Sequence, residues 1–302
     1  MSQFISINSV AEVHAQLGLT PPKHPLITVI PVKDLQYAPQ YNDVRLTLNL
    51  YHISLKDGAN CHLNYGRNSY DFTNGTMVFS KPNQVFTPND TTVSEDAKGW
   101  ILLFHPDLIR KSELGKNIEQ YSFFSYEVHE ALHLSESEID TITELMHKIE
   151  MEYQQIIDKH SQKLMVANIE LILDYSMRYY DRQFYVRTNL NQDLISKFDQ
   201  LLKEYYASDK PQELGVPSVK YCGETLGMSP NYLSDLLKKE TGTNAKGHIQ
   251  TFIVNSAKNK LLGTTASISE IAYELGFEYP QHFSTLFKNN TGSSPAAYRS
   301  VN

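Results

Sequence analysis

Hydrophobic and polar residues follow three successive patterns along the 302 residues of the chain. From about residue 20 to residue 105, short runs of β-branched and aromatic residues, such as LITVIPV and GWILLF, are separated by turn-type stretches such as KDGAN and TPND. Several short strands at this spacing are typical of a β-sandwich or a small barrel. The first third of the chain is therefore predicted to be β-structure.

A helical pattern follows from about 135 to 188. Ser135 with Glu138 is typical of a capping box at a helix start. The next apolar residues recur mostly at spacings of three and four: Ile139, Ile142, Leu145, Met146, Ile149 and Ile156. From about residue 192 the chain is predicted to be helical throughout.

The last third contains one unit twice. SVKYCGETLG (218–227) matches SISEIAYELG (267–276) at a separation of 49 residues. After the Leu-Gly pair the register slips by one, and residues such as Pro230 and Pro280 match at a separation of 50. Each copy opens with a serine suited to a helix N-cap and reaches a glycine suited to a left-handed helix end. Each copy is thus a short helix, a turn with glycine and a second helix, which is the helix-turn-helix outline.

The two predicted helix-turn-helix units span 216–241 and 266–291, and the stretch between them, 245–263, is predicted to be one helix. At 1.5 Å per residue its length is about 28 Å. Successive major-groove faces of B-DNA lie about 34 Å apart. Such a rod can hold two reading helices about one DNA turn apart, which explains why a chain would use the unit twice.

Each second helix has an apolar face and a polar face. Polar side chains near a helix N-terminus are the part that enters a major groove. The polar faces are predicted to carry Asn231, Tyr232, Ser234, Asp235 and Lys238 in the first copy, and Gln281, His282, Ser284, Thr285 and Lys288 in the second. Ser229 is the predicted N-cap of the first reading helix and is also expected among its DNA-binding residues, whereas Tyr279 is a poorer cap for the second helix.

Composition and charge modify this picture little. The chain is 41% hydrophobic and 20% charged, as in ordinary soluble proteins, and its net charge of −7 by itself disfavours nucleic acid. The charge is uneven, however, because residues 1–190 carry −7 and residues 217–302 carry 8 basic against 6 acidic groups. The N-terminus lacks the pattern of a signal peptide, no apolar run approaches about 18 residues, and the two cysteines, Cys61 and Cys222, are far apart. A cytoplasmic protein without a membrane partner is expected.

The C-terminal motif also resembles a known family. SAKNKLLGTTASISEIAYELGFEYPQHFSTLFKNNTGSSPAAYR (256–299) is similar to the signature of AraC/XylS-type transcriptional regulators, A-x-x-x-L-L, S-I-x-E-I-A-x-x-x-G-F and x-F-S-x-x-F-K-x-x-x-G-x-x-P-x-x-Y-R. With the first unit included, the resemblance covers about 100 residues. It implies a bacterial α+β protein with two parts: an N-terminal cupin-like antiparallel β-barrel with following helices, and an all-α domain with two helix-turn-helix motifs. The expected domains are a sensor barrel at 1–130, a dimerisation or docking segment at 131–190 and a DNA-binding domain at 191–302.

The resemblance further implies binding to double-stranded promoter DNA, with contact to RNA polymerase if the protein is an activator. By position, base-reading roles transfer to Pro230, Asn231, Ser234 and Asp235 in the first copy, and to Tyr279, Pro280, Gln281, Ser284 and Thr285 in the second. Phosphate contacts are expected from Lys238, Lys239, Lys288 and Asn289. Two departures stand out: Ile253 replaces a frequent arginine in the linker helix, and Asp235 would repel phosphate although its carboxylate can accept from a cytosine amino group.

The N-terminal region offers little catalytic chemistry. A metal-binding cupin needs a His-x-His pair, a glutamate and a further histidine, whereas GANCHLNYGRNSYDF (58–72) has one histidine and no glutamate. No nucleophile motif or phosphate loop is present, so no enzyme, cofactor or metal is expected. A small-molecule effector pocket is a weaker prediction, with Tyr65, Arg67, Phe86 and Trp100 as candidates; the alternative is that they are core and turn residues.

The middle helices and the helical repeat are each compatible with more than one role. The helices of 135–188 are suited either to forming a homodimer or to packing on their own barrel. A cupin-fold enzyme with a helical appendage would need convergent acid–base or metal residues. A non-catalytic adaptor would use the helical repeat to bind protein instead of DNA.

Overall fold

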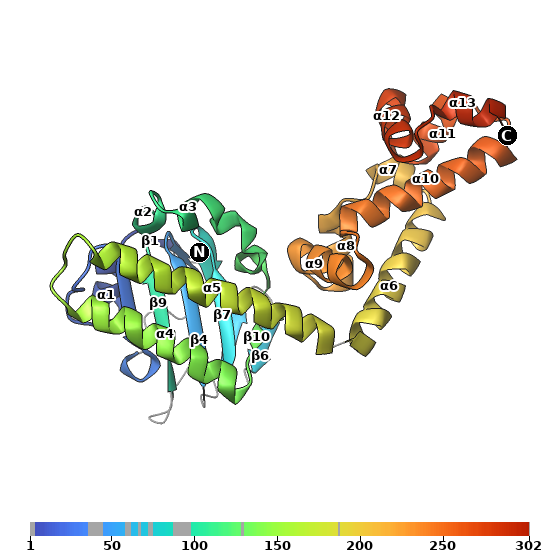
Figure 1. Ribbon diagram of the computed structural model, residues 1–302. Coiled ribbons are helices and arrows are strands. Elements are labelled where there is room, and N and C mark those ends of the chain that lie inside the picture. The colour runs from blue at the N-terminus through green and yellow to red at the C-terminus, as the bar shows by residue number, and fades with distance from the viewer. Residues whose placement is uncertain are drawn as a thin grey trace. The chain divides into compact units, whose positions relative to one another are not determined.

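A computed structural model describes residues 4–35, 45–57, 62–65, 68–71, 75–86, 98–127, 130–186 and 188–301. The chain divides into two compact units, residues 1–183 and 184–302, of which the first is rich in strands and the second is helical (Figure 1). Most of the helical segment predicted at 131–190 lies in the first unit. No helix in the described ranges is both long enough and apolar enough to cross a membrane.

The predicted strand runs all contain strands. In chain order the strands are β1 (Phe4–Ile7), β2 (Ile27–Pro31), β3 (Arg45–Leu48), β4 (Tyr51–Asp57), β5 (His62–Tyr65), β6 (Asn68–Asp71), β7 (Thr76–Ser80), β8 (Gln84–Phe86), β9 (Lys98–Phe104) and β10 (Leu132–His133). The helices of this unit are α1 (Val10–Gln16), α2 (Pro106–Ile109), α3 (Glu113–Asn117), α4 (Glu136–Gln154) and α5 (Ser161–Val186), with short 3₁₀ turns at Val32–Asp34, Ile118–Gln120 and Ser122–Ser125.

Among the described residues the strands form three sheets, and not the single closed antiparallel barrel that the resemblance implies. A five-stranded antiparallel sheet has the order β10-β7-β4-β9-β2, a second sheet has the order β1-β3-β8, and β5 pairs with β6. Within the described residues these sheets do not close on one another, and β1 pairs with β3 in parallel. The sequence signal for β1 is weak because its four residues, FISI, are too few to show a period.

One face of the large sheet packs into an aromatic and aliphatic core. Ile53 of β4 lies opposite Leu102 of β9 and Phe79 of β7, and all three side chains are buried. The Phe79 ring contacts Phe123 at 4.5 Å between centroids, and Phe123 stacks on Tyr180 of α5 at 5.4 Å. This chain of rings anchors α5 to the sheet, which lies behind α4 and α5 in Figure 1.

Polar bonds fix α5 against α4 and β10. The Arg182 guanidinium donates to both carboxylate oxygens of Glu138, at 2.8 and 2.9 Å, and to the carbonyl oxygen of His133 at 2.7 Å. Glu138 also accepts from the backbone N–H of Ser135, within the predicted capping box. Since Glu138 lies in the first turn of α4, one carboxylate both caps that helix and ties it to α5.

The second unit is built entirely of helices in the described residues. They are α6 (Thr188–Tyr206), α7 (Lys210–Leu214), α8 (Val219–Leu226), α9 (Pro230–Thr241), α10 (Ala245–Gly263), α11 (Ile268–Glu274), α12 (Pro280–Thr291) and α13 (Pro295–Val301). Figure 1 shows α10 between the pair α8–α9 and the pair α11–α12. The bounds of α10 are those of the linker helix predicted at 245–263.

Candidate nucleic-acid interface

The first helix-turn-helix consists of α8 and α9, and its ends are fixed as the sequence predicts. The Ser218 hydroxyl accepts from the backbone N–H of Tyr221 at 3.1 Å, which caps α8. Gly227 ends α8 with a φ of 71°, in the left-handed region that favours glycine. The Ser229 hydroxyl caps α9 by accepting from the Tyr232 N–H at 3.1 Å, with Pro230 in the first turn.

The second helix-turn-helix, α11 and α12, repeats this design with one weaker end. Ser267 and Glu270 form a reciprocal capping box, with bonds of 3.1 and 2.6 Å. The bond that the Ser267 backbone N–H donates to the Glu270 carboxylate, with a smaller contribution from the Ser267 hydroxyl, holds the pKa of this carboxyl below its usual value. Gly276 has a φ of 87°, while Tyr279 at the start of α12 makes no side-chain capping bond.

The repeat extends one helix further than the aligned sequence copies indicate. Thr241 and Thr291 end the two reading helices, and each hydroxyl donates to a carbonyl four residues back, at 2.7 and 2.8 Å. Asn244 then caps α10, and the Ser294 hydroxyl accepts from the backbone N–H of Ala297 at the start of α13. The sequence signal for this extension is the pair TGTNA and TGSSP, 50 residues apart.

Both reading helices pack on α10. In α9 the buried side chains include Leu233, Leu236 and Leu237, and in α12 they are Phe283 and Phe287. Contacts from α10 reach α9, α11 and α12. Ile253, which stands where the resembling family often has arginine, is 1% exposed, so this position belongs to the core of the unit.

The outward faces of α9 and α12 carry most of the predicted DNA-contacting residues. Asn231, Lys238 and Lys239 are exposed in the first copy, and Tyr279, Gln281, His282, Thr285, Lys288 and Asn289 are exposed in the second. Pro230, Ser234, Asp235, Pro280 and Ser284 are partly exposed. Two polar surfaces of similar position, one on each copy, therefore exist as the sequence pattern requires.

Two predicted members of this surface are corrected by their burial. Tyr232 is 5% exposed, so its predicted place on the outer face is wrong. Ser229 caps α9 as predicted, but it is 2% exposed and its hydroxyl is engaged in the cap, so its predicted contact with DNA is wrong. A tyrosine one residue from the apolar ridge can turn its ring inward because its hydroxyl tolerates a partly polar environment. The spacing of apolar residues along α9 does not by itself show whether the Tyr232 ring points outward or inward.

Two cations of the unit serve its internal structure. Arg299 donates to the carbonyl oxygens of Leu261 and Ala266 at 3.1 and 2.7 Å. Lys260 pairs with Glu274 at 2.6 Å. These two groups are thereby distinguished from Lys238 and Lys288, whose exposed ammonium groups lie in the last turns of α9 and α12.

Of the four predicted effector residues, the structure describes the side chain of Trp100 only. Arg67 lies outside the described residues, as do the side chains of Tyr65 and Phe86. Trp100 is 7% exposed, and its indole N–H has no hydrogen-bond partner among the described residues. In the described part of the chain no group of three or more His, Cys, Asp or Glu side chains is placed to hold a metal ion.

Comparison with known proteins agrees with the geometry of the second unit. Residues 222–300 match a family described as a helix-turn-helix domain. This match and the two helix-turn-helix motifs packed on α10 identify the type of domain. Residues 222–300 are an AraC-type helix-turn-helix domain.

Relatives of the AraC-type domain are transcriptional regulators. The uncharacterized transcriptional regulatory protein YesN of Bacillus subtilis is 37% identical over 111 residues, which cover 35% of this chain and 28% of YesN. The uncharacterized regulator YijO of Escherichia coli is 25% identical over 192 residues, 64% of each protein. The chain thus spans less than two thirds of either relative. The solved C-terminal domain of AraT, a response regulator from Geobacillus stearothermophilus, is 28% identical, with a TM-score of 0.32, covering 36% of this chain and 85% of that domain.

Proposed function

We propose that this chain is a sequence-specific transcriptional regulator that reads two successive major-groove faces of promoter DNA with α9 and α12. The observation that carries the proposal is the duplicated unit: two reading helices with matched ends and polar outer faces pack on one connecting helix. The 19 residues of α10 give a rod of about 28 Å. This length is close to the spacing of about 34 Å between successive major-groove faces.

Base reading is assigned to the first two turns of the two helices. The exposed amides of Asn231 and Gln281 can each form a bidentate pair with adenine. Asp235 is suited to accept from a cytosine amino group. Lys238, Lys239, Lys288 and Asn289 are assigned to phosphates, which set affinity and register rather than sequence.

The test is selection of genomic fragments by the purified full-length protein and by three variants. Asn231→Ala and Gln281→Ala each remove one proposed reader, and Asn259→Ala, exposed on α10, is the matched control. We expect one enriched motif with two subsites about 10 base pairs apart. Each reader variant should relax one subsite and cost about 1–3 kcal/mol there. The proposal is overturned if nothing is enriched, or if the two reader variants behave as the control does.

Control by a small molecule at the first unit is a second part of the proposal. Ser54 and Ser80 are 1% and 0% exposed, and their hydroxyls have no hydrogen-bond partner among the described residues. The register places Ser80 of β7 opposite His52 of β4. Ser54 follows His52 by two residues and shares its face, so Ser54 and Ser80 lie diagonally on one face of the sheet. Buried polar atoms without partners are costly unless something else satisfies them, which supports a polar effector there. A thermal-shift screen of metabolites on the full-length protein, repeated with Ser80→Ala, tests it; a ligand whose effect survives that substitution binds elsewhere.

Homodimerisation is proposed through the exposed side of α4 and α5. Met151 in the last turn of α4, Ile156 in the connection after α4 and Leu164 in the first turn of α5 are 66%, 93% and 49% exposed. Exposed apolar clusters of this kind support an interface. Sedimentation of the wild-type protein and of Leu164→Glu at micromolar concentration should show a dimer and a monomer respectively; a wild-type monomer contradicts this part. We further propose that the protein acts in the cytoplasm, without membrane attachment, cofactor or catalytic step, and contacts RNA polymerase if it activates.

A further inference from the structure

Tyr232, in the first turn of α9, is buried although its counterpart in the second copy is not. The two reading helices match at a separation of 50 residues, so His282 of α12 corresponds to Tyr232. His282 is exposed, whereas Tyr232 is 5% exposed. Because α9 and α12 are both 12 residues long and both begin with proline, the difference arises from what packs against α9.

Phe184 covers Tyr232. This residue lies in the last turn of α5 and belongs to the second unit, which begins at this position. Its ring centroid is 5.1 Å from that of Tyr232, and the two rings are tilted by 59°. Phe184 is 3% exposed, so both rings are shielded from water. Aromatic rings at this distance and tilt attract each other more than the apolar area that they bury would explain.

The start of α9 is fixed at two further points. The Ser229 hydroxyl accepts from the backbone N–H of Tyr232 at 3.1 Å. Gly223 of α8 lies so close to the preceding turn that a Cβ on this glycine would be 2.7 Å from the carbonyl oxygen of Met228. The first turn of α9 is therefore held by α8, by its own cap and by the last turn of α5.

The start of α12 is held differently. Tyr279 makes no side-chain capping bond there, and it is 47% exposed. The ring of His282 contacts the Tyr279 ring, with 5.5 Å between centroids. The ring beside His282 thus comes from the same helix-turn-helix, whereas the ring beside Tyr232 comes from α5.

The ring pair lies next to a proposed base reader. Asn231 directly precedes Tyr232 and is exposed. A bidentate pair between an amide and adenine requires both hydrogen bonds to have the correct length and direction, so a shift of the first turn of α9 weakens it. Because Tyr232 is buried and Asn231 is exposed, the ring contact and the reading surface lie on different sides of the helix.

We propose that Phe184 is a positioning residue for base reading by the first helix-turn-helix. Its ring holds the Tyr232 ring and thereby fixes the start of α9 in the orientation that presents Asn231 to the major groove. Phe184 lies 38 residues before residue 222, where the family match begins, so the part of the chain that reads DNA extends back into α5. This inference rests on the proposed reading of bases by α9, and it concerns that helix alone.

The first test is amide hydrogen exchange of the full-length protein without DNA. Phe184→Leu removes the ring contact but keeps an apolar side chain. Phe252→Leu is the matched control, because Phe252 lies on α10 and its ring stacks on Tyr206 of α6 at 5.2 Å, so that a ring is lost elsewhere in the second unit. The reporter is the backbone N–H of Leu233, which donates to the carbonyl oxygen of Ser229 at 3.0 Å.

We expect Phe184→Leu to accelerate exchange at Leu233 about tenfold, because the first turn of α9 opens more often. Exchange of the His282 N–H in α12 should change less than about twofold. Phe252→Leu should not accelerate exchange in α9 more than in α12. Unchanged exchange at Leu233, or equal acceleration in both helices, would overturn the proposal, since Phe184 would then at most contribute to the stability of the whole unit.

The second test is an anisotropy titration of the selected motif, with the subsite that Asn231→Ala relaxes either intact or scrambled. Phe184→Leu should weaken binding to the intact motif about fivefold, and it should have less than about twofold effect once that subsite is scrambled. Tyr232→Phe keeps the ring and should bind within about twofold of the wild type. Equal weakening on both DNAs would overturn the proposal, because loss of folded protein affects both.

Two other outcomes also decide the question. Tighter binding by Phe184→Leu would overturn the proposal, because the contact would then obstruct α9 instead of positioning it. A Phe184→Leu variant that binds as Phe252→Leu does, while Asn231→Ala still relaxes its subsite, would overturn the positioning role and leave base reading intact. If no motif is selected, base reading itself fails and this inference fails with it.

Discussion

Gly215 and Gly276 pack backbone against backbone in the second unit. A Cβ on Gly276 would lie 2.6 Å from the carbonyl carbon and 2.8 Å from the carbonyl oxygen of Gly215, and both residues have positive φ, 81° and 87°. In the first copy, a Cβ on the corresponding Gly227 would meet no described atom within 4 Å. Gly276 is therefore constrained twice, by its turn and by the segment after α7, whereas Gly227 is constrained by its turn alone.

Replacing Gly276 should destabilise the second unit more than replacing Gly227. Gly227→Ala forces a Cβ into the left-handed region, which costs about 1–2 kcal/mol. Gly276→Ala adds a backbone clash, for a total of about 2–5 kcal/mol. Guanidinium unfolding followed by circular dichroism measures both, and fluorescence of Trp100, the single tryptophan, monitors the first unit as an internal control. Equal costs for the two variants would show that the Gly215 contact contributes nothing.

Cys222 should report the opening of the same unit. Its side chain is 0% exposed, and burial raises the pKa of the thiol to about 11. Because the thiolate is the reactive form, alkylation at pH 8 should be at least about 100-fold slower in the native protein than in guanidinium. A Cys61→Ser background isolates the signal from Cys222. Rapid labelling of the native protein would mean that α8 does not stay packed.

Tyr279→Ser should separate stability from recognition. Serine at this position supplies the capping bond that Tyr279 lacks, and α12 should gain about 1 kcal/mol. If Tyr279 contacts DNA as proposed, affinity for the selected motif should nevertheless fall, because the exposed ring is lost. Thermal denaturation and anisotropy on the same preparation measure the two effects. A stabilised variant with unchanged affinity would remove Tyr279 from the reading surface and leave the other positions untouched.

The first unit should lose stability in acid through His52. Desolvation of the ring, with a smaller contribution from the positive charge of Lys56, lowers the pKa of His52 to about 3 from an ordinary 6.5. Between these two pH values the unfolded chain binds a proton that the folded chain does not. Stability contributed by neutral His52 is therefore full above pH 6.5 and falls below it by up to about 1.4 kcal/mol per pH unit. Urea unfolding monitored by Trp100 fluorescence at pH 7, 6 and 5 should show this slope, and His52→Gln should reduce it.

Sequence periodicity predicts the second unit far better than the first. Helix ends in the second unit are set by capping residues, such as Ser218 and Gly227, and such residues can be recognised from the sequence alone. The pairing of β1 with β3 depends instead on contacts between residues distant along the chain, so sheet order and barrel closure are not derivable from local patterns. For the same reason the pattern places the polar faces of α9 and α12 but misplaces Tyr232, whose ring direction depends on packing.

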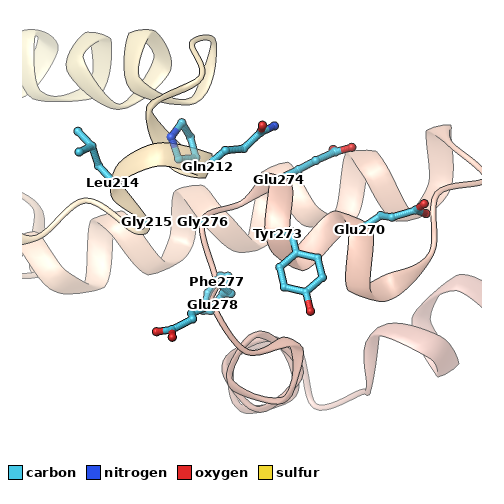
Figure 2. A pocket seen from close by; sticks show the side chains of 10 residues that line it. Gln212, Leu214, Gly215, Glu270, Tyr273, Glu274, Gly276, Phe277 and Glu278 are labelled. Atoms are coloured by element: carbon cyan, nitrogen blue, oxygen red, sulfur yellow. The ribbon is translucent and has the colours of Figure 1, made fainter.

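The contact between α7 and α11 is not visible in the sequence for a related cause (Figure 2). The local pattern shows Glu270 and Tyr273 only as parts of a capped helix, because nothing in it brings Leu214 to their side. The contact requires the glycine pair at 215 and 276, and each glycine alone is typical of an ordinary turn. A surface formed by two segments about 60 residues apart therefore needs the fold.

If both copies engage DNA, Lys238 and Lys288 should contribute equally to the salt dependence of binding. They occupy equivalent positions 50 residues apart, are exposed, and lie in the last turns of the two reading helices. Each phosphate that a lysine neutralises adds about −0.9 to the slope of log K against log salt concentration. Lys238→Gln and Lys288→Gln should therefore each flatten the slope by about 0.9, and the double variant by about 1.8. The control is Lys148→Gln, on α4 of the first unit, which should leave the slope unchanged. Anisotropy titrations of the selected motif between about 50 and 200 mM salt measure the effect. A flattened slope with only one of the two substitutions would mean that a single helix-turn-helix holds the DNA, and the second copy would then have a different role.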